Sequence, residues 1–179
     1  SFFYFTPNSS IVAIPMGGND LPFVFKEMSA DYQTVTIQGQ ISYQISTPKK
    51  LADVLDFTVN EQGKYKKNDL EKLNQRTINE AQTAVTAFIH SLSLQDTLGA
   101  ASTLEQRILS GLQSSPMIGM LGIEIMGVNI LAVRAVPEMT RALETSTREK
   151  LQQEADEAIY ERRNFAVEQE RKIKESELN

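Results

Sequence analysis

The sequence predicts an α+β fold: a largely antiparallel sheet with helices packed on one face, followed by a long C-terminal coiled-coil-like helix. Apolar residues recur with a period of two in the strand-like segments and a period near 3.6 in the helix-like ones. Strand patterns come first, two helical patterns follow, and one strand pattern returns, an order typical of α+β domains. All nine Gly and all six Pro lie at or before Pro137. We therefore predict a head of residues 1–137 and an arm of residues 138–179.

The first strands are short, and the third is long. Ile11–Ile14 reads as a buried strand that ends at Pro15 and a Gly-Gly turn, and a second strand is expected around Phe23–Lys26. Residues 34–46 alternate between apolar and polar side chains, which predicts a half-buried strand. Gly39 lies at the centre of this strand and predicts a bend or a hairpin there.

The helical patterns begin after Pro48. Residues 49–57 predict a short amphipathic helix, with Leu51, Val54 and Leu55 on one side. Residues 69–94 predict a long helix, for which Asp69 is the expected N-cap.

A further helix and a last strand complete the predicted head. Residues 102–114 predict a helix that opens with a Ser-x-x-Glu capping box at Ser102 and Glu105. Residues 122–136 return to strand character, and Glu124 is expected on the solvent face of that strand.

The arm is expected to be one helix from Pro137 to the end of the chain, because Pro suits a first helical turn and no Gly or Pro follows. Its apolar stripe is narrow and rich in Ala, and it fits either an eleven-residue repeat or a heptad repeat. Such a stripe predicts association with a copy or a neighbour, and the alternative is a helix docked on its own head. The residues expected to mediate association are Leu151, Ala155, Ala158, Ile159, Arg162, Ala166 and Ile173.

The composition argues against several classes of function. The net charge of −5 disfavours a nucleic-acid binder, and the absence of Cys excludes disulfides, Cys-based metal sites and thiol nucleophiles. His90 is the single histidine, and the pattern nominates no nucleophile or carboxylate beside it. No carboxylate cluster has the spacing of a metal loop. We therefore predict no catalytic residue, no bound metal and no cofactor.

The N-terminal segment contains four consecutive aromatic residues, Phe2, Phe3, Tyr4 and Phe5. They fit a first strand, and they equally fit the interfacial end of a membrane anchor, where aromatic side chains gather. The chain begins with Ser1 rather than Met, and the helical pattern of the arm continues to its last residue. We therefore expect a segment of a longer protein.

Five segments follow one another in a recognisable order: TPNSSIVAIPMG, SADYQTVTIQGQISYQISTP, RTINEAQTAVTAFIHSLSLQDTL, GIEIMGVNILAVRAVPEMTRALE and the charged helix after them. In these segments and their order, the chain resembles the SPFH or band 7 family, which includes stomatin, prohibitin and flotillin. Residues 60–68 look like a polar insertion in this pattern.

The resemblance implies a non-enzymatic scaffold that sits on a membrane, forms homo-oligomers, and organises lipids and partner proteins such as a membrane protease or channel. Membrane association would come from an N-terminal anchor that this sequence does not include. The residues alone also fit a soluble cytosolic adaptor whose C-terminal helix docks a partner protein. An enzyme with a carboxylate-based site is a third hypothesis.

Overall fold

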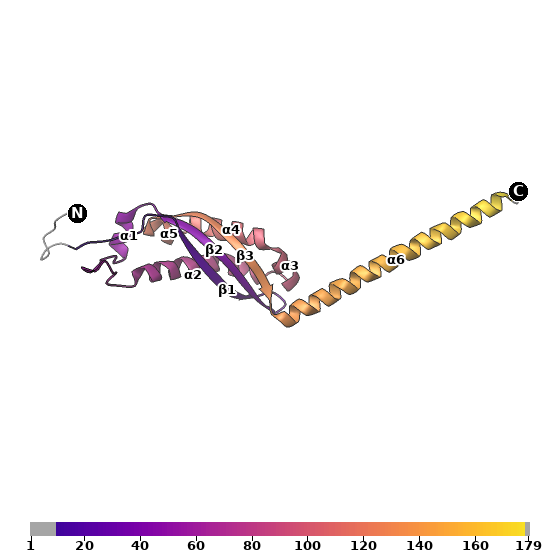
Figure 1. Ribbon diagram of the computed structural model, residues 1–179, viewed down its shortest axis with the longest axis horizontal. Coiled ribbons are helices and arrows are strands. Elements are labelled where there is room, and N and C mark those ends of the chain that lie inside the picture. Colours follow the sequence, from indigo (N-terminus) through magenta and orange to yellow (C-terminus); the bar gives the residue numbers. More distant parts are fainter. Residues whose placement is uncertain (1–9, 178–179) are drawn as a thin grey trace. The chain divides into compact units, whose positions relative to one another are not determined.

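The computed structural model describes residues 10–177, and the chain divides into two compact units between Ala135 and Val136. The first unit holds an antiparallel sheet with helices against one face, and the second is one long helix (Figure 1). The α+β class predicted from the sequence is therefore confirmed. We keep the names head and arm for the two units.

The sheet of the head has three strands, β1 (Asn19–Met28), β2 (Thr34–Ile45) and β3 (Ile123–Ala135), and β2 lies between the other two. Both pairings are antiparallel. The alternation in β2 is the one expected from the sequence, because every second side chain from Val35 to Ile45 except Gly39 is buried as an apolar side chain. Tyr43 also carries a polar hydroxyl group, which donates to Asn74 Oδ1 at 2.8 Å.

Gly39 does not interrupt β2, so the hairpin considered at this position is wrong. The pairing with β3 shifts register between Gln38 and Gly39, which is the local irregularity that the glycine marks. A Cβ at Gly39 would lie 2.6 Å from the carbonyl oxygen of Asn129 on β3. The residue is glycine because neighbouring strands approach too closely for a side chain.

Two long helices, α2 (Asp69–Ile89) and α4 (Ala101–Ser114), cover one face of the sheet (Figure 1). They also pack on each other and lie close together at Gly111, where a Cβ would lie 2.6 Å from Ala84 Cβ. The apolar stripes of both helices face inward. The buried apolar residues of the two helices are Leu73, Ala81, Val85, Ile89, Leu104, Ile108 and Leu112.

Three short helices complete the head: α1 (Pro48–Val54), α3 (Leu94–Gly99) and α5 (Pro116–Leu121). The sequence did not predict α3 or α5. The N-cap of α3 is Ser93, whose Oγ accepts the amide of Asp96 at 3.1 Å. The helix α5 ends at Gly122, which adopts a left-handed conformation with φ of 64°.

Both predicted helix caps are wrong, because tertiary contacts use the same side chains. Asp69 is the first residue of α2 rather than its cap, and its carboxylate accepts the backbone amide of Asp56 at 2.8 Å. Ser102 lies inside α4, which begins after Ala100. The Glu105 carboxylate accepts the amide of Ile130 on β3 at 2.7 Å instead of closing a capping box.

Two further expectations in the first part of the chain need correction. Ile11–Ile14 is not a buried strand: Val12 is exposed and forms a single bridge with Thr58. The helix expected over residues 49–57 ends at Val54, which is exposed, while Leu51 and Leu55 are buried. Glu124, in contrast, lies on the exposed face of β3 as expected, where Gln44 Nε2 donates to it at 2.8 Å.

The second unit consists of α6 (Pro137–Glu177), a helix of 41 residues. Pro137 occupies its first position, as expected, and the amide of Thr140 donates to the carbonyl of Val136 at 3.1 Å. Every side chain from Glu144 to Ser176 is exposed. The arm therefore offers its whole circumference for contacts.

Candidate functional site

The single histidine of the chain lies among contacts that join α2 to the sheet. His90 follows the last residue of α2, and its Nε2 lies 3.4 Å from Glu27 Oε2 on β1. The Glu27 side chain is 8% exposed, and its Oε1 accepts from Gln82 at 2.6 Å and from Thr86 at 3.2 Å. These contacts tie α2 to the edge of the sheet and place no nucleophile beside the imidazole.

Carboxylates meet at the beginning of α2, where they line a concavity of about 310 Å³ with Lys67. Asp56 accepts from the hydroxyl and the amide of Thr58 and from Lys67 Nζ at 3.0 Å. These bonds, from Thr58 first and then Lys67, hold the pKa of Asp56 far below its usual range. Asp69 accepts from Lys72 at 2.7 Å in addition to the Asp56 amide. The carboxylates are thus engaged in holding the loop on the helix.

No group of three or more metal-ligating side chains occurs in the part of the chain that the structure describes. Residues 10–177 also contain no helix with the length and apolar character needed to cross a bilayer.

The polar segment after α1 forms a small hairpin. Val59 pairs with Tyr65, and Gly63 supplies the positive φ of the turn between them. The rings of Phe57 and Tyr65 meet edge to face, with centroids 5.9 Å apart. The sequence did not predict this hairpin.

This hairpin holds the first described residues of the chain. The amide of Val59 donates to the Ile11 carbonyl at 3.0 Å, and the amide of Ala13 donates to the Phe57 carbonyl at 3.1 Å. The aromatic residues Phe2, Phe3, Tyr4 and Phe5, expected near a membrane, lie outside the described residues. The alternative prediction, that these four residues form a first strand, also concerns residues outside the described part of the chain.

The residues expected to mediate association all lie on α6 and are all exposed. At 3.6 residues per turn they fall within a stripe about 100° wide. We call this stripe the front face of the arm. Its members are Leu151, Ala155, Ala158, Ile159, Arg162, Ala166 and Ile173. Contact of this face with another copy stays a prediction.

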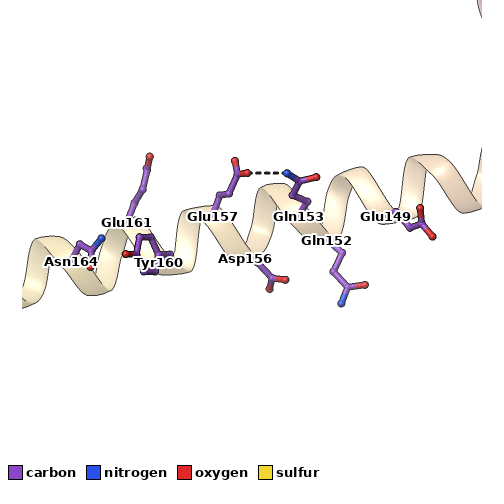
Figure 2. A pocket seen from close by; sticks show the side chains of 8 residues that line it. All are labelled: Glu149, Gln152, Gln153, Asp156, Glu157, Tyr160, Glu161 and Asn164. Carbon is purple, nitrogen blue, oxygen red and sulfur yellow. Dashed lines mark hydrogen bonds between the residues drawn. The ribbon is translucent and has the colours of Figure 1, made fainter.

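The opposite side of α6 has a different character, which the sequence reading missed. Eight side chains line this side, and all of them come from this one helix (Figure 2). We call this lining the back face. Its members are Glu149, Gln152, Gln153, Asp156, Glu157, Tyr160, Glu161 and Asn164.

The back face has no second wall that would enclose a small ligand. It combines four carboxylates with the ring of Tyr160, which is 67% exposed. At 3.6 residues per turn, Lys150 and Arg163 fall in the same sector of the helix. Val167, seven residues further along the helix, extends the apolar part and is 64% exposed. The signal that reveals this face is helical spacing of acidic residues, which a search for apolar stripes passes over.

A family model described as SPFH domain / Band 7 family matches residues 2–166. The match therefore spans the described head and most of the arm, including both of the faces just described up to residue 166. A search of curated proteins finds no match.

Proposed function

Since this chain belongs to the SPFH domain / Band 7 family, we propose that it is a non-enzymatic, membrane-associated scaffold whose copies assemble through the arm. Proteins of this family generally form oligomers and associate with membranes. An anchor N-terminal to the head would supply the membrane attachment, and this part of the proposal rests on the family alone. The scaffold would organise lipids and membrane proteins around it.

The observation that carries the proposal is the exposure of the arm. The front-face residues Leu151, Ile159 and Ile173 are 61%, 50% and 55% exposed. Helices in proteins owe most of their stability to packing of an apolar face, and these side chains pack on nothing within the described arm. Burying them between copies would remove apolar area from water at about 25 cal/mol per Å². A second copy of the arm supplies a surface of matching length.

The test replaces Leu151 and Ile173 together with Asp and measures the sedimentation mass of the chain over a range of concentrations. We expect the higher-mass species of the wild type to be lost. Thr145→Asp with Ser146→Asp is the matched control, because it adds the same charge at exposed positions of α6 outside the front face. An unchanged mass in the Leu151 and Ile173 variant would remove the front face from the proposal.

The membrane part of the proposal has its own test. Cells that express the full-length protein are separated into membrane and supernatant fractions. A scaffold of the proposed kind is recovered with the membranes, whereas a soluble adaptor that docks a partner through its arm is recovered in the supernatant.

A further inference from the structure

We propose that two copies of the head pack face to face through the side of the sheet that the helices leave uncovered, antiparallel and related by a two-fold axis. The helices of the head lie against the other side (Figure 1). We call the uncovered side the open face. This contact is made by the head alone, so it goes beyond association through the arm and does not depend on it.

The open face is formed by the side chains that alternate with the buried ones. From Thr36 to Gln44 of β2 these are half-buried amides and hydroxyls, and in β1 they are exposed from Asp20 to Met28. Antiparallel sheets can keep one face in water, so exposure alone does not identify a contact. The inference rests on how the charged and apolar side chains are arranged on this face.

The charge of the open face comes from four residues. The three strands contain five charged residues in all, and Glu27 is the one on the covered side, where its carboxylate accepts from two side chains of α2. The other four are exposed on the open face, and they are Asp20, Lys26, Glu124 and Arg134. Two of these are acidic and two are basic, so the charges of this face balance.

The two signs lie at opposite ends of the strands. Lys26 of β1 and Arg134 of β3 form a basic end, because both lie opposite Thr36 of β2. Asp20 and Glu124 form an acidic end, opposite residues 42 and 44 of β2. At 3.3 Å per residue, the two ends are about 20–26 Å apart.

The basic end has no partner within the head. Neither Lys26 nor Arg134 forms an ion pair or a side-chain hydrogen bond with any residue of the described range 10–177. The carboxylates of Asp20 and Glu124 accept from neutral side chains of β2 at 2.7 and 2.8 Å. Both ends can therefore pair with the charges of a second copy.

A two-fold axis that lies between the two sheets and perpendicular to the strands brings unlike ends together. Each strand then runs antiparallel over the same strand of the second copy, with Lys26 over Asp20 and Arg134 over Glu124. An axis parallel to the strands would place the two basic ends over each other, and like charges in contact are unfavourable. The charges therefore select the antiparallel arrangement, in which every pair occurs twice.

The exposed apolar side chains match in the same arrangement. Two register shifts leave Met126 and Leu131 of β3 without a residue opposite them on β2, and their side chains are 60% and 65% exposed. The rotation places Leu131 of each copy over Met126 of the other, and Val24, which is 58% exposed, over Pro22. Covering these side chains removes apolar area from water, which favours the contact.

A single position of the axis serves all of these pairs. The charged residues of β1 lie opposite residues 36 and 42 of β2, which are centred on Gly39. Those of β3 lie opposite residues 36 and 44, which are centred on Gln40, and the two register shifts, at 38–39 and 42–43, are centred between Gln40 and Ile41. These centres lie within two residues of one another, or about 7 Å, a difference that long side chains can span.

The experiment uses the whole 179-residue chain with Leu151→Asp and Ile173→Asp, so that association through the arm does not mask the contact. Sedimentation of this parent over a concentration series is expected to show a monomer–dimer equilibrium. Adding Lys26→Glu with Arg134→Glu is expected to weaken dimerisation about tenfold, because repulsion replaces attraction at four exposed pairs.

The matched control is Lys64→Glu with Arg76→Glu, which makes the same change of charge at exposed positions outside the sheet. It is expected to leave dimerisation unchanged. Circular dichroism checks that every variant keeps its fold. A Lys26 and Arg134 variant that dimerises as well as the parent would overturn the open-face contact.

Mixing provides a rescue. Asp20→Lys with Glu124→Lys makes the open face wholly basic, whereas Lys26→Glu with Arg134→Glu makes it wholly acidic. Each variant alone is expected to dimerise weakly, and a mixture of the two is expected to form one-to-one pairs. A mixture without pairs, or a parent that stays monomeric at every concentration, overturns the open-face contact. The scaffold proposal is judged separately, by the effect of the arm substitutions on the wild type.

Cysteine trapping tests the orientation, since the chain has no Cys of its own. Gln40→Cys lies beside the proposed axis and is expected to form a disulfide with the same position of the second copy under oxidising conditions. Thr34→Cys lies on the same face of β2, six residues from Gln40, and is expected to stay reduced. A disulfide at Thr34→Cys, or none at Gln40→Cys in chains that dimerise, would overturn the antiparallel arrangement.

Discussion

Gly39 of β2 lies directly opposite Phe23 of β1, and the aromatic ring occupies the space of the missing side chain. A Cβ at Gly39 would lie 2.9 Å from Phe23 Cε1 and 2.6 Å from the backbone oxygen of Asn129. The Phe23 ring also stacks on Phe25, with centroids 4.4 Å apart. One glycine thus lets a pair of rings lie flat in the core while three strands pass close together.

Gly39→Ala is therefore expected to destabilise the head by about 1–3 kcal/mol, because the added methyl group overpacks a site that includes rigid backbone. Urea unfolding followed by circular dichroism measures the change. Gly127→Ala in β3 is the control, since nothing lies within 4 Å of a Cβ there. Equal stabilities of the two variants would contradict the close approach seen at Gly39.

Gly122 and Gly119 should respond to alanine with opposite signs. Gly122 has φ of 64°, and its Cβ would lie 2.7 Å from the carbonyl oxygen of Thr47. Gly122→Ala is expected to cost about 1–3 kcal/mol, since the residue would be both strained and crowded. Gly119 lies inside α5 with nothing within 4 Å of its Cβ, so Gly119→Ala is expected to stabilise by about 0.5–1 kcal/mol. Thermal unfolding of both variants checks the pair.

Glu27 and His90 should contribute unequally, although they lie 3.4 Å apart. Glu27→Ala removes the common acceptor of Gln82 and Thr86 at a buried position, and we expect a loss of about 1–3 kcal/mol. His90 has a side chain that is 52% exposed, and His90→Ala is expected to change the free energy of unfolding by less than about 0.5 kcal/mol. A larger effect from His90 would indicate a role that these contacts do not explain.

Asp56 makes the stability of the head dependent on pH. Hydrogen bonds from Thr58 and Lys67 lower its pKa in the folded chain, so the folded state binds a proton less readily than the unfolded state does. This stabilisation is fully present above the unfolded pKa of about 3.9 and is lost as pH falls toward the folded pKa.

Asp56→Asn removes that titration. We therefore expect the variant to be less stable than the wild type at neutral pH, and the difference to shrink steadily below about pH 4. Urea unfolding at several pH values measures it. A difference that stays constant into strong acid would show that Asp56 acts through packing rather than through its charge.

The elements that the sequence predicted well are those with a long, uninterrupted period. The alternating side chains of β2 and the apolar stripe of α2 predict which residues are buried, because each pattern repeats over several residue pairs or helical turns. The class of the fold followed from the order of these patterns. The arm was predicted as one helix from Pro137 because no residue after it breaks the pattern.

The errors fall where a distant residue competes for the same group. Asp69 is of a residue type that favours an N-cap, but its carboxylate accepts the backbone amide of Asp56 instead. The Glu105 carboxylate likewise accepts the backbone amide of Ile130. The helices α3 and α5 have six residues each, too few for a period to emerge. The back face of the arm was missed for another reason: its spacing is carried by acidic side chains, and apolar periodicity does not detect them.

The position of β3 also has a consequence for the order of folding. The central strand β2 pairs with a strand that the chain supplies late, since Val35 lies opposite Ala135. Closing a loop of about 100 residues is slow. During synthesis, one edge of β2 therefore remains unpaired long after β1 has paired with the other edge. The arm is made only after β3 is complete. Because β3 leaves the ribosome before the arm does, the sheet can begin to close before the segment proposed to recruit neighbours has emerged.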